Sequence, residues 1–356
     1  MKKLKEKRCK MSHPFKQFYP VWDAQKLLDW AYRNASKKST SIPKSIPMLM
    51  KIKRKEMNRI KRASDLLIER IEKIVKSVPN LDELPLFYKK LSNILVDNDK
   101  LRKSLGRING VIPVIKKLVG RYKSLLFDQK NAKGCSKIRV EFFGRCSSLI
   151  RKLNPAFKYL DDCREALKQI PPINLTMPNV VVAGYPNVGK STLVGQISSA
   201  KPMISSYPFT TKQIFIGVYK DDLGSEFFQV IDTPGILDRP MEKRNKIEKQ
   251  AILALNTIAT LVLFVFDPTP TSGYSVDSQI QLFNEIKEKF LQNIRIPLKI
   301  IINKIDFATD EEIDTLLDKI GKKREDVILM NAKEGENVEK VVESLLDYFR
   351  TTNFRR

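Results

Sequence analysis

The chain has 356 residues, of which 42% are hydrophobic, and its formal net charge is +25. This length suits two globular domains that can each bury a core. The longest apolar runs fall far short of the roughly 20 residues that a membrane span needs. No apolar stretch follows the basic N-terminus, so we also expect no secretory signal. Four cysteines without a Cys-x-x-Cys pair, and a single histidine, exclude a zinc site and do not imply disulfides.

The positive charge is concentrated in the N-terminal half of the chain. Residues 1–170 carry 42 Lys and Arg against 16 Asp and Glu, a net charge of +26. Residues 171–356 carry 23 against 24, a net charge of −1. A neutral domain joined to a strongly basic one is typical of a protein that binds a polyanion. Nucleic acid is the first candidate and an anionic membrane surface is the second.

The N-terminal half is predicted to be helical. Residues 1–10 form a basic arm, either a mobile binding segment or a solvated tail. Apolar residues recur at helical spacing over residues 55–78, 86–96, 99–127, 137–153 and 156–170. Pro113, with two glycines before it, should kink or split the third of these helices. We expect an antiparallel bundle of four or five helices over residues 1–170, followed by an extended linker over residues 171–178.

The polar faces of these helices are basic, and few acids lie between the cations. We interpret the set as a surface that contacts phosphates, although any one of them could be part of a solvated helix face. The residues are Lys103, Arg107, Lys116, Lys117, Arg121, Lys123, Lys137, Arg139, Arg145, Arg151 and Lys152. Six aromatic residues before the bundle either stack on unpaired bases or anchor their segment to the core. They are Phe15, Phe18, Tyr19, Trp22, Trp30 and Tyr32.

Residues 184–191 have the sequence G-Y-P-N-V-G-K-S, the phosphate-binding pattern G-x-x-x-x-G-K-S. The pattern follows an apolar strand-like run, 179–183, and precedes a helix-like segment, 191–199. Glycines allow backbone N–H groups to converge on phosphate oxygens, and the helix N-terminus adds its positive end. The residues predicted to contact the nucleotide here are Gly184, Tyr185, Pro186, Asn187, Val188, Gly189, Lys190, Ser191 and Thr192.

Two further segments predict a Mg²⁺ site and the contacts of a γ-phosphate. Residues 207–212 resemble a first switch, in which a threonine hydroxyl completes the metal shell only while the γ-phosphate is present. We assign Thr211 to this role, with Thr210 as the competitor. Ser191 supplies the other hydroxyl, and Asp232, after the strand 227–231, reaches the metal, usually through water. The Gly235 N–H can bond the γ-phosphate, and residues 236–246 form the second switch.

Two loops predict that the base is guanine. Asn303, Lys304 and Asp306 follow the strand 298–302. The Asp306 carboxylate can accept from guanine N1–H and the exocyclic amine, whereas adenine would leave it unpaired. The Lys304 stem can lie along the base plane. Asn331, Ala332 and Lys333 follow the strand 326–330 and offer a backbone N–H to the guanine oxygen, although the first position is more often Ser.

The pattern from residue 179 to 356 predicts an α/β domain with a doubly wound, mainly parallel sheet and the ligand at the strand C-termini. Ile236 occupies the position where many GTPases carry a catalytic glutamine, so we expect unassisted turnover on the order of 10⁻⁴–10⁻² per second. Help would come from K⁺ bound at Asn187, or from a partner. The alternative is that Asn187 only stabilises its loop. The residues predicted to support hydrolysis are Lys190, Thr211, Gly235 and Asn187.

The motifs at 184–191, 207–212 and 232–236 resemble the Obg branch of GTPases. The basic helical half, with 86–91 and 104–108, and the segments 264–268 and 272–274 are similar to the nucleolar GTP-binding protein 1 (Nog1) family over nearly the whole chain. The resemblance implies GTP or GDP with Mg²⁺, and as partners rRNA and the precursor of the large ribosomal subunit. The short chain resembles archaeal forms, which implies a cytoplasmic monomer (a eukaryotic one would be nucleolar).

Two other readings of the sequence stay open. One is a signalling GTPase whose basic bundle docks on an acidic protein or a membrane surface. The other is an RNA-binding module that holds GTP without meaningful hydrolysis. The salt dependence of RNA binding separates the first alternative from an RNA-bound switch.

Overall fold

The computed structural model describes residues 13–37, 45–208, 213–221, 223–235, 237–238, 245–291 and 296–352. The chain divides into two compact units. We call the first the helical unit, which comprises Phe15–Glu83 and Leu95–Lys168. We call the second the sheet unit, which comprises Met1–Pro14, Leu84–Ile94 and Gln169–Arg356.

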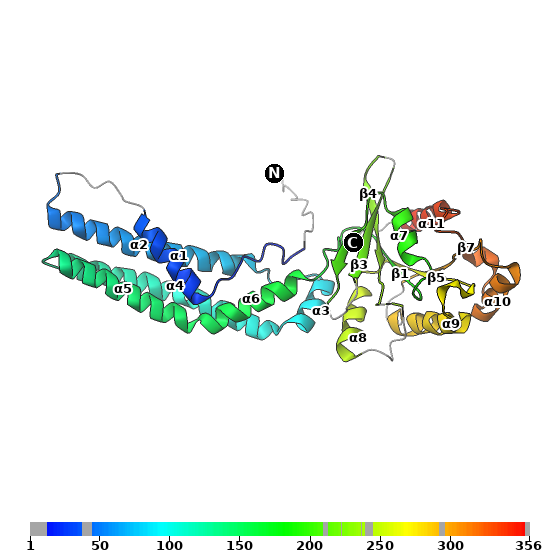
Figure 1. The fold of residues 1–356 in the computed structure, drawn as a ribbon, viewed down its shortest axis with the longest axis horizontal. Coiled ribbons are helices and arrows are strands. Elements are labelled where there is room, and N and C mark those ends of the chain that lie inside the picture. Colours follow the sequence, from blue (N-terminus) through cyan, green and yellow to red (C-terminus); the bar gives the residue numbers. More distant parts are fainter. Residues whose placement is uncertain are drawn as a thin grey trace, which may run out of the picture. The chain divides into compact units, whose positions relative to one another are not determined.

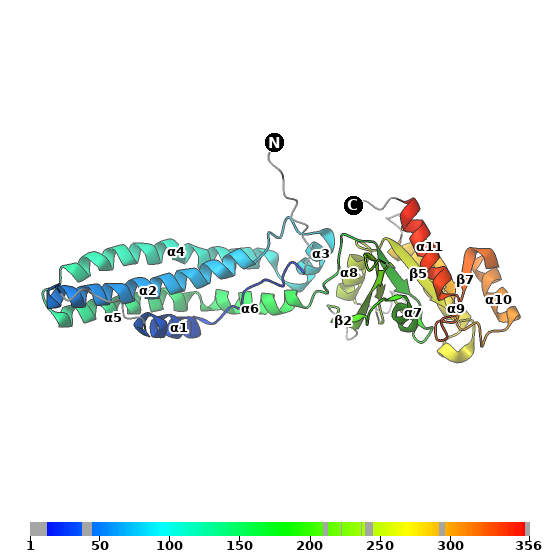
Figure 2. The ribbon, with the colours of Figure 1, turned by 90° about the horizontal axis from the view of Figure 1, so that it is seen from above.

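Five helices build the described part of the helical unit: α1 (Ala24–Lys37), α2 (Met48–Ser77), α4 (Asn98–Phe127), α5 (Ala132–Lys152) and α6 (Asn154–Lys168). The long helices α2 and α4 lie alongside each other and α5, and α2 runs in the opposite direction to α4 (Figures 1 and 2). Their apolar stripes meet in one core, with Leu67, Ile71, Ile115 and Phe142 fully buried. The predicted helical bundle is confirmed.

The sequence predicts that Pro113 kinks or splits its helix, and helix α4 is not split there. The helix runs unbroken from Asn98 to Phe127, and Asp97 caps its start by accepting from the Lys100 N–H. Pro113 lies on the exposed side of the helix. A proline there removes one hydrogen bond, but water can satisfy the carbonyl that loses its partner. Ile112 and Ile115 stay buried on the other side.

Helix α3 (Leu86–Leu95) groups with the sheet unit, although the domain limits predicted from sequence place it in the bundle. Its Tyr88 is buried, and the hydroxyl donates to the Ile173 carbonyl at 3.2 Å. Residues 171–178, expected as an extended linker, also belong to this unit. Ile173 is fully buried, and the Asn174 N–H donates to Gln229 Oε1 at 2.9 Å.

The sheet has seven strands in the order β2-β3-β4-β1-β5-β6-β7. They are β1 (Asn179–Ala183), β2 (Met203–Ser206), β3 (Gln213–Lys220), β4 (Glu226–Asp232), β5 (Leu261–Phe266), β6 (Leu298–Ile302) and β7 (Val327–Leu329). β2 and β3 pair antiparallel with their neighbours, and the other pairs are parallel. Every residue of β1 and β5 is buried, as expected for central strands of a parallel sheet. The predicted fold class is confirmed.

Helices cover the sheet (Figures 1 and 2). They are α7 (Lys190–Ile197), α8 (Lys246–Leu255), α9 (Val276–Glu285), α10 (Asp310–Ile320) and α11 (Val338–Thr351), and a π-helical turn, Ile286–Phe290, extends α9. Parallel strands bring the loops after β1, β4, β5, β6 and β7 to one edge of the sheet. In the described part of the chain, no helix is long and apolar enough to span a bilayer.

Candidate nucleotide-binding and RNA-binding sites

The loop between β1 and α7 needs glycine at two positions. Gly189 has φ +100°, and a Cβ there would lie 2.1 Å from Asn303 Nδ2. Gly184 has φ +139°, and a Cβ there would lie 2.5 Å from the Val265 carbonyl oxygen. Any side chain would therefore push the loop away from its neighbours and out of its backbone conformation. This explains why the phosphate-binding pattern carries glycine at both ends of the loop.

Lys190 opens helix α7 and points back under the loop. Its side chain is buried, and Nζ donates to the Tyr185 carbonyl at 2.6 Å. Burial lowers the pKa of Lys190, while the carboxylates of Asp232 and Asp238 oppose that shift. A buried cation beside a helix N-terminus is the arrangement that binds phosphate oxygens. In the same loop Val188 is fully buried, Pro186 is half-buried, and Asn187 and Thr192 are exposed.

Ser191 and Asp232, predicted as metal ligands, are in contact. Ser191 Oγ donates to Asp232 Oδ2 at 2.5 Å. Asp232 is fully buried, and its Oδ1 makes no hydrogen bond of standard geometry with the described residues. Burial raises the pKa of Asp232, and the Ser191 hydroxyl and the Lys190 charge oppose the rise. An unpaired carboxylate oxygen next to a hydroxyl fits Mg²⁺, which prefers oxygen ligands. Thr210 and Thr211 lie outside the described residues.

A pocket of about 370 Å³ lies between the loops that follow β1, β5, β6 and β7. Its lining brings together nine of the residues predicted from sequence: Asn187, Gly189, Thr192, Asn303, Lys304, Asp306, Asn331, Ala332 and Lys333. Thr271 and Phe307 also line it and were not predicted. Four separate loops thus meet where the sequence predicts the guanine base.

Asn303 ties three of these loops together. Its Nδ2 donates to the Val188 carbonyl, and its Oδ1 accepts from the Ala332 N–H, both at 2.8 Å. Asn331, the departure from the usual Ser, accepts at Oδ1 from the N–H groups of Lys333 (3.0 Å) and Glu334 (3.3 Å). This side chain therefore shapes the third loop as a hydroxyl could, and the departure leaves the loop intact.

Lys304 is held by a carboxylate that the sequence analysis did not assign. Its Nζ lies 2.6 Å from Asp267 Oδ2 and donates to Thr271 Oγ1 at 2.8 Å. Asp267 follows β5, is fully buried, and also accepts from the N–H and hydroxyl of Thr269. Lys304 itself has φ +62°. These contacts fix the ammonium, so the aliphatic stem stays along the pocket where the base would lie.

We expect Asp267→Asn to lower the affinity for GTP and GDP alike by about tenfold, because Lys304 loses its charged partner. Asparagine can still accept from Thr269, so the loop should keep its shape. Isothermal titration with both nucleotides gives the affinities. The matched control is the Lys304→Met variant. In that variant, adding Asp267→Asn should not lower the nucleotide affinity further. Independent losses that add in the double variant would mean that Asp267 does not act through Lys304.

The Gly235 N–H, predicted to bond a γ-phosphate, has a partner in this structure. It donates to Oδ2 of Asp238 at 2.6 Å. Asp238 is 8% exposed, and the sequence assigns it only to the second switch, residues 236–246. Ile236 and residues 239–244 lie outside the described residues.

Comparison with known proteins identifies the family. Residues 15–174 match the model of the NOG1 N-terminal helical domain, and residues 246–306 match that of nucleolar GTP-binding protein 1 (NOG1). An uncharacterized protein of Methanocaldococcus jannaschii is 35% identical over 85% of this chain and 83% of its own length. The chain belongs to the NOG1 family.

Other NOG1 relatives are longer than this chain. The probable nucleolar GTP-binding protein 1 of Dictyostelium discoideum is 35% identical over 72% of the chain, which spans 37% of that relative. The Saccharomyces cerevisiae protein is 29% identical over 85% of the chain, which spans 46% of it. A Plasmodium falciparum NOG1 crystal structure, 29% identical, covers 52% of this chain and 92% of its own, with a TM-score of 0.43. The chain therefore belongs to a family named for GTP binding, and its sheet unit has the fold class of the P-loop GTPases.

The helical unit of this NOG1-family chain exposes the predicted basic face. Helix α4 carries eight Lys and Arg and one acid, Asp99. Lys103, Arg107, Lys117 and Arg121 are exposed, and no ion pair involves them among the described residues. Arg139 differs from the rest of the set, because it is half-buried and pairs with the buried Glu56 at 2.5 Å.

The six aromatic residues of this segment differ in burial, and two of them, Trp30 and Tyr32, lie in α1, within the bundle rather than before it. Phe15 and Phe18 are buried, so they anchor their segment. Tyr32 stacks on Phe143 and donates to its carbonyl, and burial raises the pKa of Tyr32. Trp22 and Trp30 are half-buried.

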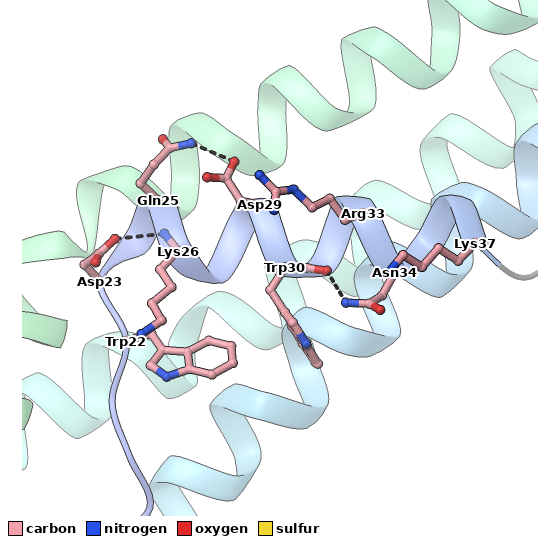
Figure 3. Close-up of a pocket in the computed structure, with 9 residues that line it drawn as sticks. All are labelled: Trp22, Asp23, Gln25, Lys26, Asp29, Trp30, Arg33, Asn34 and Lys37. Carbon is pink, nitrogen blue, oxygen red and sulfur yellow. Dashed lines mark hydrogen bonds between the residues drawn. The ribbon is translucent and has the colours of Figure 1, made fainter.

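Trp22, just before α1, and Trp30, on α1, pack edge to face with ring centres 5.7 Å apart, and both line an open pocket of about 630 Å³ (Figure 3). Arg70 lies 3.1 Å from the centre of a Trp22 ring, which braces that ring against α2. Lys26 and Arg33 also line the pocket. Anchoring therefore accounts for Phe15, Phe18 and Tyr32, whereas the two indoles line the open pocket.

Proposed function

We propose that this protein is a GTPase switch in the assembly of the large ribosomal subunit, with its helical unit bound to rRNA. The observation that supports it most is the pairing of two sites in one chain. One is the pocket in which predicted phosphate-, metal- and base-contacting residues converge. The other is the basic face of α4, where Lys103, Arg107, Lys117 and Arg121 are exposed and form no ion pair with the described residues. The relatives' name, nucleolar GTP-binding protein 1, fits this reading.

The hydrolytic step would be slow without help. Ile236 has no polar group to orient water, whereas Lys190 and the Gly235 N–H would stabilise charge on the γ-phosphate. We propose that Ser191 and Asp232 contact Mg²⁺, with Thr211 from the first switch. Asn187 has φ +63° and an exposed side chain beside the loop, where a bound K⁺ could reach it. The ribosomal particle would supply the remaining groups.

The RNA surface can be tested on α4. Lys117→Ala with Arg121→Ala removes two exposed cations one helical turn apart. We expect affinity for large-subunit rRNA to fall about tenfold and the slope of log affinity against log salt to become shallower by about 2, because two phosphate contacts are lost. A filter-binding titration from low to high salt measures both quantities.

Lys73→Ala with Lys76→Ala in α2 is the matched control. These lysines are also two exposed cations on one helix, three residues apart, but each already pairs with a glutamate, at 2.7 and 3.1 Å. The control should change affinity less than twofold. Equal losses in the two variants would argue for a diffuse charge effect. Tight binding to anionic vesicles instead of RNA would support the signalling alternative.

We further propose that the protein acts where ribosomes are assembled, which is the cytoplasm in an archaeon and the nucleolus in a eukaryote. The second alternative, an RNA-binding module that holds GTP without turning it over, would show tight RNA binding and no turnover in any condition.

A further inference from the structure

Asp238 occupies a position that conflicts with a bound γ-phosphate. Its Oδ2 accepts from the Gly235 N–H at 2.6 Å, and this is the amide that the proposed function assigns to the γ-phosphate. The contact is that of an anion at a backbone donor, and Gly235 has φ +74°, a conformation that favours glycine. A carboxylate oxygen and a phosphate oxygen cannot both take this hydrogen bond.

The segment that carries Asp238 is fastened to the phosphate-binding loop. The Leu237 N–H donates to the Thr233 carbonyl at 3.3 Å, and the Leu237 carbonyl accepts from the Gly184 N–H at 3.1 Å. Leu237 is 3% exposed. The backbone hydrogen bonds of Leu237 thus fix the position of the next residue, Asp238. Its carboxylate is therefore held in the site and is not an unconstrained surface group.

Asp238 also shares its surroundings with the charges of the phosphate site. Its carboxylate helps to keep the pKa of buried Lys190 from falling further, and it adds to the rise in the pKa of Asp232. All three groups are buried, where charges act on each other more strongly than in water. A γ-phosphate that arrived beside Lys190 would meet a second anion at close range.

We propose that Asp238 stands in for the γ-phosphate: its carboxylate holds the Gly235 amide while the site contains GDP or no nucleotide, and GTP binds only by displacing it. Asp238 therefore sets the preference of this site between GDP and GTP. Displacement of Asp238 makes the free energy of GTP binding less favourable. GDP binding does not require it, because GDP has no group at the Gly235 amide. Asp238 follows Leu237, whose carbonyl accepts from the Gly184 N–H. Movement of Asp238 on γ-phosphate binding would therefore act on the hydrogen bond between Leu237 and Gly184.

The test compares the affinities of GDP and the non-hydrolysable analogue GMPPNP in Mg²⁺ buffer, for the full chain and for Asp238→Asn. Asparagine keeps an acceptor oxygen for the Gly235 N–H but removes the negative charge. We expect the dissociation constant of GMPPNP to fall about tenfold while that of GDP changes less than twofold. Asp347→Asn, which removes one exposed carboxylate on α11, is the control and should change neither value.

Asp238→Ser is the second variant, for the case that asparagine disturbs the fold. Its hydroxyl is a neutral acceptor, and it should shift the ratio of the two dissociation constants in the same direction. An unchanged ratio in a folded variant, or weaker GMPPNP binding, would overturn the inference and leave the proposed GTPase function standing. The inference rests on that function, and failure of the unmodified protein to bind either nucleotide would overturn both.

Discussion

Replacement of Lys190 by alanine should lower the affinity for GTP by at least about 100-fold, while affinity for rRNA changes less than twofold. Lys190 is the buried cation of the phosphate-binding loop and is held by the Tyr185 carbonyl at 2.6 Å. Its ammonium would exchange that carbonyl for phosphate oxygens, and a charge-assisted bond of this kind is among the strongest in a binding site. Fluorescent-nucleotide titration and filter binding measure the two affinities.

The division of the chain into two units explains why the affinity for rRNA should not change. Lys190 belongs to the sheet unit, whereas the exposed cations of α4 belong to the helical unit. Lys201→Ala removes an exposed lysine from the same unit and is the control for net charge; it should affect neither ligand. Equal losses of GTP and rRNA affinity in Lys190→Ala would contradict the assignment of the two ligands to separate units.

Replacement of Asp306 by asparagine should move the base preference from guanine to xanthine. The Asp306 carboxylate lines the pocket with Lys304 and would accept two hydrogen bonds from the guanine edge. Asparagine offers an N–H₂ where guanine also presents a donor, so affinity for GTP should fall about 1000-fold. Xanthine carries a carbonyl in place of the amine, so XTP should bind the variant better than GTP does.

Competition of GTP, XTP and ATP against a fluorescent guanine nucleotide measures this preference. Asp318→Asn, on the exposed side of α10, is the matched control and should retain guanine selectivity. Unchanged GTP selectivity in Asp306→Asn would refute the role assigned to this carboxylate. A loss of all nucleotide binding without a gain for XTP would mean that Asp306 supports the loop instead of the base.

The nucleotide loops were predictable because their chemistry is contiguous in sequence. Gly189, Lys190 and Ser191 are consecutive and follow a strand after a short loop, and Asn303 and Asp306 lie just after another strand. Each segment can therefore be placed at a strand C-terminus before the order of the strands is known. The pocket then follows from the sheet, which brings these ends to one edge.

Asp267 and Asp238 could not be assigned in the same way. Asp267 gains its role from Lys304, 37 residues later in the chain, and from its complete burial. Asp238 gains its role from a turn that brings it back to Gly235. Both carboxylates look like ordinary loop residues in the sequence, because neither the partner nor the burial is encoded within a short motif.

Helix α1 and the boundaries of the two units could not be predicted from the sequence either. The buried face of α1 consists of Leu27 and Leu28 with alanines. The periodicity of apolar residues in this segment is therefore weak, and the large tryptophans do not follow it. The support of α1 is distant, since the Ala24 N–H donates to Asn154 Oδ1. Helix α3 has a regular apolar face, but the pattern does not say which core that face joins, and Tyr88 joins the sheet unit.

The most direct test of an assembly switch is GTP turnover with and without purified large-subunit precursor particles from the same organism, measured in K⁺ buffer and again in Na⁺ buffer. We expect slow turnover by the protein alone, on the order of 10⁻⁴–10⁻² per second, and strong stimulation by the particles. A fall in turnover when Na⁺ replaces K⁺ would support the role of Asn187, and no change would refute it. Tight binding to the particles without any stimulation would contradict the switch and would leave a placeholder that holds GTP until another factor releases it.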